Sequence, residues 1–273
     1  MHDVLQYEGK RVVVTGCASG MGAATAAILG ELGAHVIGLD VKETAGVEQF
    51  VGVDLRAPES IDQAVAAIGS PVDAVFSVAG LPGPPFSDLD TVLVNFVGAR
   101  SLIEALVPAM PAGAAVACVA SNAGLGWQQN LEVLLPAVRT VGFEAGRAWC
   151  EANPDKILGG YGPSKQLTNA WVADRAVDLI KQSIRLNHTN PGPTDTAMMP
   201  AFEHQVGKAL IDAFVGPSGR RSTPEEQAWP LVFLNSPRCS YVTGEALHTD
   251  AGFLGAMVTG RLEVDLPPEG PSV

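Results

Sequence analysis

Short apolar runs alternate with longer amphipathic stretches along most of the chain. The runs are mostly continuous rather than alternating, which is typical of strands covered on both faces. We expect strands at 11–15, 35–39, 49–53, 73–78, 114–120, 184–188 and 246–249. We expect helices at 21–32, from 58 onward, and at 87–107, 163–180 and 224–234. Strands that alternate with helices in this way indicate βαβ units and a parallel sheet.

We therefore predict one α/β domain over residues 1–273, a doubly wound Rossmann-type sheet of about seven strands with helices on both faces. Two segments interrupt the alternation. Residues 125–158 form a mostly helical insertion before the helix at 163–180, and residues 197–219, rich in Met and Phe, are expected to form a substrate lid. Residues 265–273 contain three prolines and are predicted to be a frayed tail.

Charge and cysteine content narrow the function. The 29 acidic residues outnumber the 17 basic ones, giving a net charge of −12, which disfavours binding to nucleic acid or to an anionic membrane. The four cysteines are far apart, which argues against a disulfide framework and favours a reducing compartment. The polar start does not read as a signal peptide, so a cytoplasmic location is expected. The five histidines lack ligand spacing, so no metal site is predicted.

A glycine-rich loop follows the first predicted strand and reads Thr15-Gly16-Cys17-Ala18-Ser19-Gly20-Met21-Gly22. Its glycines permit a tight turn close to a pyrophosphate, and the helix that follows supplies free N–H groups. Asp40 ends the second strand 18 residues after Gly22, near the position of a ribose-binding carboxylate. It would repel a 2′-phosphate, and Val41 rather than a basic residue follows it, so NAD is favoured over NADP. The alternative is that Asp40 is only a solvated acid at a strand end.

Tyr161 and Lys165 lie four residues apart at the start of a predicted helix, so they share one helical face. An ammonium beside a phenol favours the phenolate and should lower the tyrosine pKa, making Tyr161 a candidate general acid/base. The spacing alone is more often a surface pair, so this assignment depends on the surrounding motifs.

Together these motifs resemble the short-chain dehydrogenase/reductase superfamily over most of the chain. The matching positions, in the family's order, are 15–22, Asp40, Asp54-Leu55, Ala79-Gly80, Asn95, Ser121, Tyr161 with Lys165, Asn190-Pro191-Gly192 running on to Thr196, and Asp250. The chain departs from the family in having Ser77-Val78 before Ala79-Gly80, where two asparagines are common, and Ala251-Gly252 where two glycines are usual.

The resemblance implies a role for each matching residue. Tyr161 would exchange a proton with the substrate oxygen, and Lys165 would hold the nicotinamide ribose. Ser121 would bind the substrate oxygen, and Asn95 would anchor a water in a proton relay. Asp54 and Leu55 would meet the adenine, Ala79 and Gly80 the adenosine ribose, and Pro191, Gly192 and Thr196 the carboxamide. The residues expected to contact the cofactor are Gly16, Ala18, Ser19, Gly20, Met21, Gly22, Asp40, Val41, Asp54, Leu55, Ala79, Gly80, Tyr161, Lys165, Pro191, Gly192, Thr194 and Thr196.

Ser121 and Tyr161 are 40 residues apart. The extra segment between them, with the loop Gly-Cys-Ala-Ser-Gly-Met-Gly, resembles the bacterial 3α-hydroxysteroid dehydrogenase/carbonyl reductase and coniferyl-alcohol dehydrogenase subgroup. This resemblance implies NAD-linked interconversion of a secondary or allylic alcohol and its carbonyl on a bulky, hydrophobic, ring-containing substrate. An apolar lid suits such a substrate. The candidate lid residues are Met198, Met199, Phe202, Leu210, Ile211 and Phe214, and Trp127 is a further candidate for the pocket wall.

The insertion is too apolar to lie in water, so it must cover either the chain's own sheet end or a second subunit. The residues concerned are Leu131, Val133, Leu134, Leu135, Val138, Val141 and Phe143. The resemblance implies a homo-oligomer, a dimer or a tetramer. The main alternative function is a catalytically inactive NAD-binding scaffold or sensor. An epimerase or dehydratase is a second alternative, and a hydrolase is disfavoured because the chain lacks a G-x-S-x-G motif.

Overall fold

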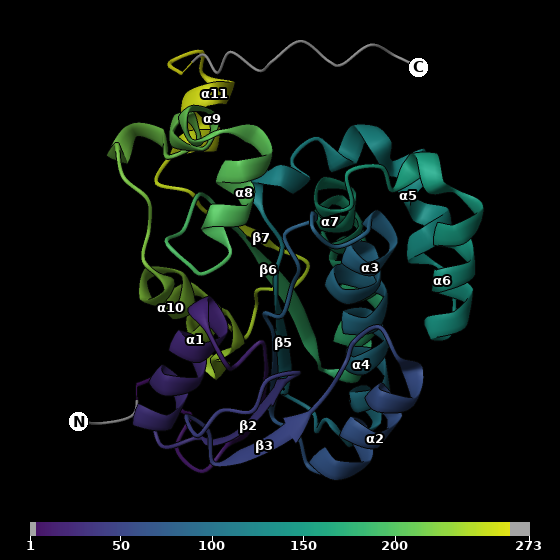
Figure 1. The fold of residues 1–273 in the computed structure, drawn as a ribbon. Helices are drawn as coiled ribbons and strands as arrows, with labels where there is room; N and C mark the ends of the chain where they lie inside the picture. Colours follow the sequence, from purple (N-terminus) through teal and green to yellow (C-terminus); the bar gives the residue numbers. More distant parts are fainter. Residues whose placement is uncertain (1–3, 263–273) are drawn as a thin grey trace.

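Seven parallel strands form one sheet in the order β3-β2-β1-β4-β5-β6-β7, and Figure 1 shows this sheet between two layers of helices. The computed structural model describes residues 4–262, so the predicted frayed tail at 265–273 lies outside the described residues. The strands are β1 Arg11–Thr15, β2 His35–Asp40, β3 Gln49–Gly52, β4 Ala74–Ser77, β5 Ala115–Val119, β6 Arg185–Pro191 and β7 Ala246–Thr249. The strand order reverses between β1 and β4, where doubly wound sheets bind ligands. The predicted fold class is confirmed.

Helices cover both faces of the sheet. One face packs against α1 Gly20–Glu31 and α10 Pro224–Asn235, and the other against α2 Pro58–Ile68, α4 Ala99–Leu106 and α7 Tyr161–Leu179. The remaining helices are α3 Asp88–Val92, α5 Leu131–Val138, α6 Gly142–Ala152, α8 Met199–Val206, α9 Lys208–Ala213 and α11 Phe253–Val258.

Burial on both faces explains the continuous apolar runs. In β1, Val12 and Val14 join the core under α1 and α10, whereas Val13 joins the core on the opposite face. All three valines are inaccessible to solvent. Burying a valine side chain contributes roughly 1.5–3 kcal/mol, so a polar residue at any of these positions would be costly.

The helix expected at 87–107 is not a single α-helix. It begins at Asp88, with Ser87 as its N-cap, and residues Leu93–Gly98 form a π-helical turn between α3 and α4. Apolar periodicity does not separate a π-turn from an α-helix, and such turns often occur at functional sites. The stretch Asp88–Ala109 is long and apolar enough to cross a membrane, but 67% of its most apolar window is buried in the protein, as in a core helix.

The insertion covers helices of its own chain. Helices α5 and α6 pack against α7 and the π-helical turn, and in Figure 1 they flank α7 and α3 at the outer side of this layer. Leu134, Val138 and Phe143 are buried in the core, whereas Val133 and Val141 remain exposed. Of the two expected roles, covering the chain's own elements is therefore the one that the fold shows, at the helical layer rather than at the sheet end.

Arg100 on α4 anchors this insertion. Its guanidinium is 1% exposed and donates hydrogen bonds to Ala137 O, Val138 O, Thr140 Oγ1 and Gly142 O at 2.9–3.2 Å. It therefore binds the carbonyls at the C-terminal end of α5, where the helix dipole favours a cation. Burial lowers the Arg100 pKa.

We predict that Arg100→Met destabilises the protein by about 2–4 kcal/mol, because it leaves several buried acceptors without a donor. Arg100→Lys should recover part of this loss, since one ammonium cannot reach all four acceptors. Urea unfolding measures both changes, and an unchanged unfolding free energy in Arg100→Met would contradict the anchoring role.

Candidate active site

A cavity of about 320 Å³ lies at the C-terminal ends of β1, β2 and β4, and the glycine-rich loop forms one wall. Gly16 has a φ of +73°, and a Cβ there would lie 2.9 Å from the backbone of Ala79. A Cβ at Gly22 would lie 2.1 Å from Gly16 O. Only glycine therefore lets the loop fold between β4 and the N-terminus of α1, which leaves the free N–H groups of that helix facing the cavity.

Asp40 closes the cavity at the end of β2. Its Oδ2 accepts a hydrogen bond from Ala18 N at 3.1 Å, and its Oδ1 accepts one from Lys42 N at 3.0 Å. These bonds fix the carboxylate while leaving lone pairs for ribose hydroxyls. Val41, next to it, is 75% exposed at the cavity edge.

Arg56 is a lining residue that the sequence analysis missed. It forms a two-pronged ion pair with Asp54, with Nε–Oδ1 at 3.0 Å and Nη2–Oδ2 at 2.7 Å. This contact lowers the pKa of Asp54. The carboxylate expected to meet the adenine is thus already occupied by an arginine, and its adenine contact remains a prediction. The signal was an arginine two residues after Asp54, which sequence alone does not distinguish from a surface residue.

The loop after β4 forms the floor of this cavity. Thr15 Oγ1 accepts hydrogen bonds from Val78 N and Ala79 N at 3.0 Å. Asn95, in the π-helical turn, accepts from Leu81 N at 2.7 Å and donates to Leu81 O and Ser164 Oγ at 3.0 Å. Its amide therefore fastens the loop to α7, and the predicted water relay at this residue remains a prediction.

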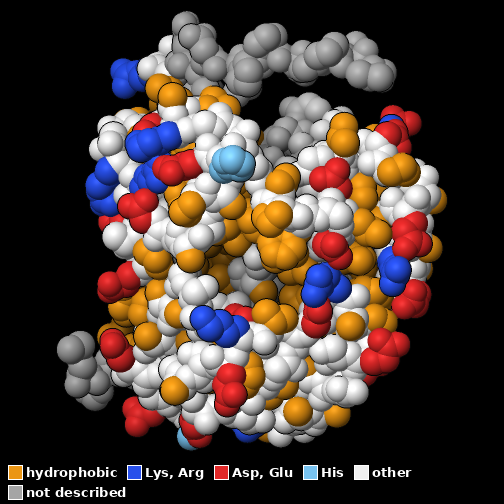
Figure 2. Space-filling model, viewed as in Figure 1, with side chains coloured by type: hydrophobic (Ala, Val, Ile, Leu, Met, Phe, Trp, Pro, Cys, Tyr) orange, Lys and Arg blue, Asp and Glu red, His pale blue; other side chains and the backbone are white. Residues whose placement is uncertain are grey.

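A second cavity, of about 380 Å³, adjoins the first, and the two share Met21, Thr196 and Met198 in their walls. Ser121 and Tyr161 lie on its wall. Figure 2, viewed as in Figure 1, shows hydrophobic side chains around a hollow at the centre of the molecule. The wall also contains Pro191, Gly192, Thr194 and all six predicted lid residues, Met198, Met199, Phe202, Leu210, Ile211 and Phe214. Its described lining includes no charged side chain and no histidine.

The wall of the second cavity differs from the expectation in one residue and contains others that were not predicted. Trp127 is not among the residues that line the cavity, and its side chain packs against the hydrophobic core. The residues missed by the sequence analysis include Asn122 and Gln205. Gln205, on lid helix α8, donates from Nε2 to Pro82 O and Pro84 O at 3.2 Å, so it joins the lid to the loop after β4. Within residues 4–262, no three His, Cys, Asp or Glu side chains are grouped as metal ligands.

Of the four residues predicted to be catalytic, Ser121 and Tyr161 meet at this wall. Tyr161 is the first residue of α7, and its ring packs edge-on against Phe202 with centroids 4.7 Å apart. Ser121, which follows β5, hydrogen-bonds the Tyr161 hydroxyl, and its own N–H donates to Asn190 Oδ1 at 3.2 Å. Lys165, one turn along α7, places Nζ 5.3 Å from the tyrosine ring centroid.

Comparison with known proteins identifies the family. A family model described as short chain dehydrogenase matches residues 10–132, and one described as Enoyl-(Acyl carrier protein) reductase matches residues 152–254. Coniferyl-alcohol dehydrogenase of Pseudomonas sp. (strain HR199 / DSM 7063) is 30% identical over 256 residues, covering 93% of this chain and 100% of that protein. The chain belongs to the short-chain dehydrogenase/reductase family.

Two further relatives agree. The 3-alpha-hydroxysteroid dehydrogenase/carbonyl reductase of Comamonas testosteroni is 34% identical, covering 90% of this chain and 97% of that protein. The crystal structure of the 3-alpha-hydroxysteroid dehydrogenase from Pseudomonas sp. B-0831 complexed with NADH has a TM-score of 0.78 and 26% identity, covering 92% of this chain and 99% of the other. This short-chain dehydrogenase is thus an oxidoreductase of alcohols and carbonyls, in a family that uses nicotinamide cofactors. The two family models leave residues 133–151 unmatched, which lie within the insertion.

The pKa of Tyr161 differs from the expectation. Burial raises the pKa of Tyr161, and the hydrogen bond with Ser121 only partly opposes this. Burial also lowers the pKa of Lys165 to about 8. In the pH range where the phenol of this short-chain dehydrogenase would ionise, Lys165 is therefore neutral and supplies no positive charge. Its Nζ instead donates to Val119 O at 2.9 Å. The predicted lowering of the tyrosine pKa by Lys165 is therefore wrong.

The Lys165 shift predicts a pH dependence of stability. The folded lysine releases its proton at about pH 8 and the unfolded one near its ordinary pKa of 10.5. Between these values the unfolded chain binds more protons, so the free energy of unfolding should rise with pH, by up to about 3 kcal/mol from this group.

Lys165→Met is the matched control, since other groups titrate in the same range. The unfolding free energy of the wild type minus that of Lys165→Met should increase between pH 7.5 and pH 10.5. A difference that stays constant with pH would show that the lysine is not depressed in the folded state.

Proposed function

We propose that this chain is an NAD-dependent dehydrogenase that interconverts a secondary or allylic alcohol and its carbonyl on a bulky, hydrophobic, ring-containing substrate, with Tyr161 as general acid/base. The observation that carries the proposal is the placement of Tyr161 and Ser121 on the wall of an uncharged apolar cavity next to the glycine-loop cavity. The relatives named for coniferyl alcohol and for 3-alpha-hydroxysteroids support this substrate class.

The uncharged wall favours a neutral substrate. A carboxylate or phosphate entering the second cavity would lose its hydration without meeting a cation. A neutral ring system would contact Met199, Phe202 and Ile211 on the lid. The cavity volume of about 380 Å³ lies toward the small end of small-molecule pockets, which span about 300–1,000 Å³.

The preference for NAD rests on the adenosine end of the first cavity. Asp40 would accept hydrogen bonds from ribose hydroxyls and would repel a 2′-phosphate. Arg56 is the basic side chain among the residues that line this cavity, and its guanidinium is already paired with Asp54. The relative solved with NADH is consistent with this preference.

Each polar group then has a defined task. NAD, when bound, supplies the hydride acceptor. Ser121 Oγ–H would donate a hydrogen bond to the substrate oxygen, and Tyr161 would take the alcohol proton or return it to a carbonyl. The raised pKa keeps Tyr161 as the phenol at neutral pH, which is the form that protonates a carbonyl oxygen. Alcohol oxidation requires the phenolate, so its rate is expected to rise with pH. Lys165, already fixed one helical turn away, would hold the nicotinamide ribose.

Turnover with a substrate panel tests the proposal. Purified protein is incubated with NAD or NADP and a 3α-hydroxysteroid, coniferyl alcohol or carveol, and reduced nicotinamide is followed by absorbance. We expect turnover with NAD on at least one alcohol, and a loss of at least about 100-fold in Tyr161→Phe with NAD affinity retained. NAD binding without turnover on any alcohol would instead favour the inactive scaffold, and preference for NADP would contradict the role of Asp40.

We further propose that the chain forms a homo-oligomer, a dimer or a tetramer. The insertion covers α7 and the π-helical turn, whereas Trp229 and Phe233, one turn apart on α10, are 42% and 49% exposed. Light scattering should give a mass of two or four chains at micromolar concentration, and a lower mass for the variant carrying Trp229→Ser and Phe233→Ser. A wild-type monomer would contradict this proposal.

A further inference from the structure

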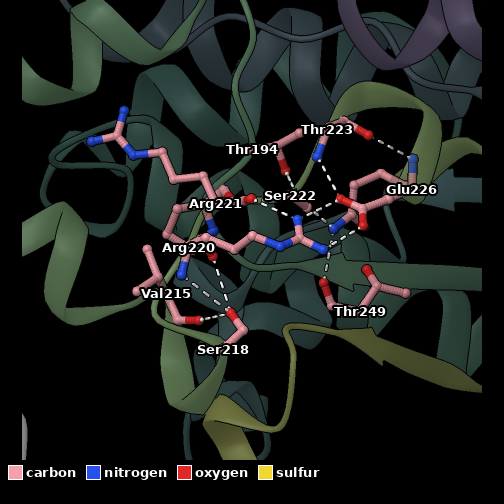
Figure 3. Close-up of polar contacts among 11 residues, drawn as sticks. Thr194, Val215, Ser218, Arg220, Arg221, Ser222, Thr223, Glu226 and Thr249 are labelled. Atoms are coloured by element: carbon pink, nitrogen blue, oxygen red, sulfur yellow. Dashed lines mark hydrogen bonds and ion pairs between the residues drawn. The ribbon is translucent and has the colours of Figure 1, made fainter.

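The segment that follows the lid is hydrogen-bonded to the loop after β6, at residues 193–196. Thr194 pairs with Ser222 in a parallel bridge, with Asp195 N donating to Ser222 O at 2.9 Å and Ser222 N donating to Pro193 O at 3.0 Å. The Thr194 and Ser222 hydroxyls also hydrogen-bond at 2.9 Å, as Figure 3 shows. The loop that ends at Thr196 and the exit from the lid therefore form one unit.

Arg221 extends from this unit to both lid helices. Its Nη2 lies 2.6 Å from a carboxylate oxygen of Glu203 on α8 and 2.8 Å from one of Asp212 on α9. Its Nη1 lies 3.6 Å from Asp195, between Thr194 and Thr196. One guanidinium thus joins three carboxylates from three separate segments.

The Arg221 guanidinium is largely buried and can pair with several carboxylates at once. Its side chain is only 14% exposed, so water screens its ion pairs less than those of a typical surface arginine, whose pairs contribute about 0–1 kcal/mol. The planar group reaches several oxygens at once, which a lysine ammonium cannot do equally well. The neighbouring carboxylates hold the Arg221 pKa above its ordinary value.

The lid helices divide their residues between this contact and the cavity. Glu203 and Asp212 contact Arg221, whereas Phe202 and Ile211, their immediate neighbours in sequence, line the cavity. A shift of either helix away from Arg221 would therefore also move the apolar wall opposite Tyr161.

We propose that Arg221 is a positioning residue that holds both lid helices over the substrate cavity and couples them to the loop at Thr194 and Thr196. Without it, Asp195, Glu203 and Asp212 lose their common cation and repel one another, and Lys208, which pairs with Asp212, compensates only one of them. The effect of Arg221 on kinetics rests on the proposed function, but its effect on the opening of the lid does not.

A protease that cleaves only after lysine reports the lid directly. Lys208 is the only lysine after Lys181, so cleavage within the lid occurs at one bond, and substitution of an arginine creates or removes no site. In Arg221→Gln we expect cleavage after Lys208 to be at least about 5-fold faster than in the wild type, which corresponds to about 1 kcal/mol of local opening.

Arg220→Gln is the matched control. Arg220 is the adjacent residue, but it pairs with Glu226 at the start of α10 rather than with the lid, as Figure 3 shows. We expect its cleavage rate to stay within about 2-fold of the wild type. Lys165 is buried in the core, so cleavage after it requires global opening, whereas cleavage after Lys208 requires only local opening of the lid. Equal acceleration at Lys165 and Lys208, or equal acceleration in both arginine variants, would overturn the proposal.

Kinetics provide the second readout. With an alcohol that the wild type oxidises, Arg221→Gln should raise KM by about 5- to 10-fold with a smaller change in kcat, and Arg221→Lys should restore part of the loss. Unchanged KM and unchanged proteolysis in Arg221→Gln would refute the clamp. If no alcohol is turned over, the proposed function fails, while the proteolysis result still decides whether Arg221 holds the lid.

Discussion

The burial of the Lys165 ammonium is the constraint on which the active-site geometry depends. The side chain is enclosed between β5 and α7, and Nζ donates to Val119 O, the carbonyl that ends β5. Burying an ammonium is costly unless it is hydrogen-bonded, and this contact links the first turns of α7 to the end of β5. Tyr161, one turn earlier on α7, is thereby brought beside Ser121 at the end of the same strand. The same burial lowers the Lys165 pKa and raises that of Tyr161.

Lys165 is a charged group buried in the core, whereas the charged side chains of the lid lie outside the cavity. Glu203 and Asp212 pair with Arg221, and Lys208 pairs with Asp212, while neighbouring residues of the lid line an uncharged wall. A short amphipathic helix has little stability of its own, so α8 and α9 need tertiary contacts at both ends. Arg221 supplies one, and Gln205, bound to Pro82 O and Pro84 O, supplies the other. Helices α8 and α9 thus carry apolar residues that line the pocket and charged residues that pair with Arg221.

Sequence reasoning succeeded where a pattern is local. The strands follow from apolar runs, and the structure confirms them. The glycine loop, Asp40 and the apolar lid residues follow from runs and spacings, and they line two adjoining cavities. It failed where a tertiary contact decides the outcome. The Arg56–Asp54 pair and the direction of the Tyr161 pKa depend on neighbours and burial that no spacing encodes. The π-helical turn at Leu93–Gly98 shares its apolar character with an α-helix, so periodicity alone could not reveal it.

The insertion and the candidate active site are connected through that turn. Arg100, just after the turn, holds the carbonyls at the end of α5 and the start of α6, and Asn95, within the turn, holds the loop at Leu81 and Ser164 on α7. Asn95 and Arg100 lie on one continuous helical segment, so the insertion supports the element that fixes the floor of the first cavity. A π-turn is less stable than an α-turn, and packing on both sides is what can maintain it. The insertion thus has a physical role within this chain, in supporting the π-helical turn.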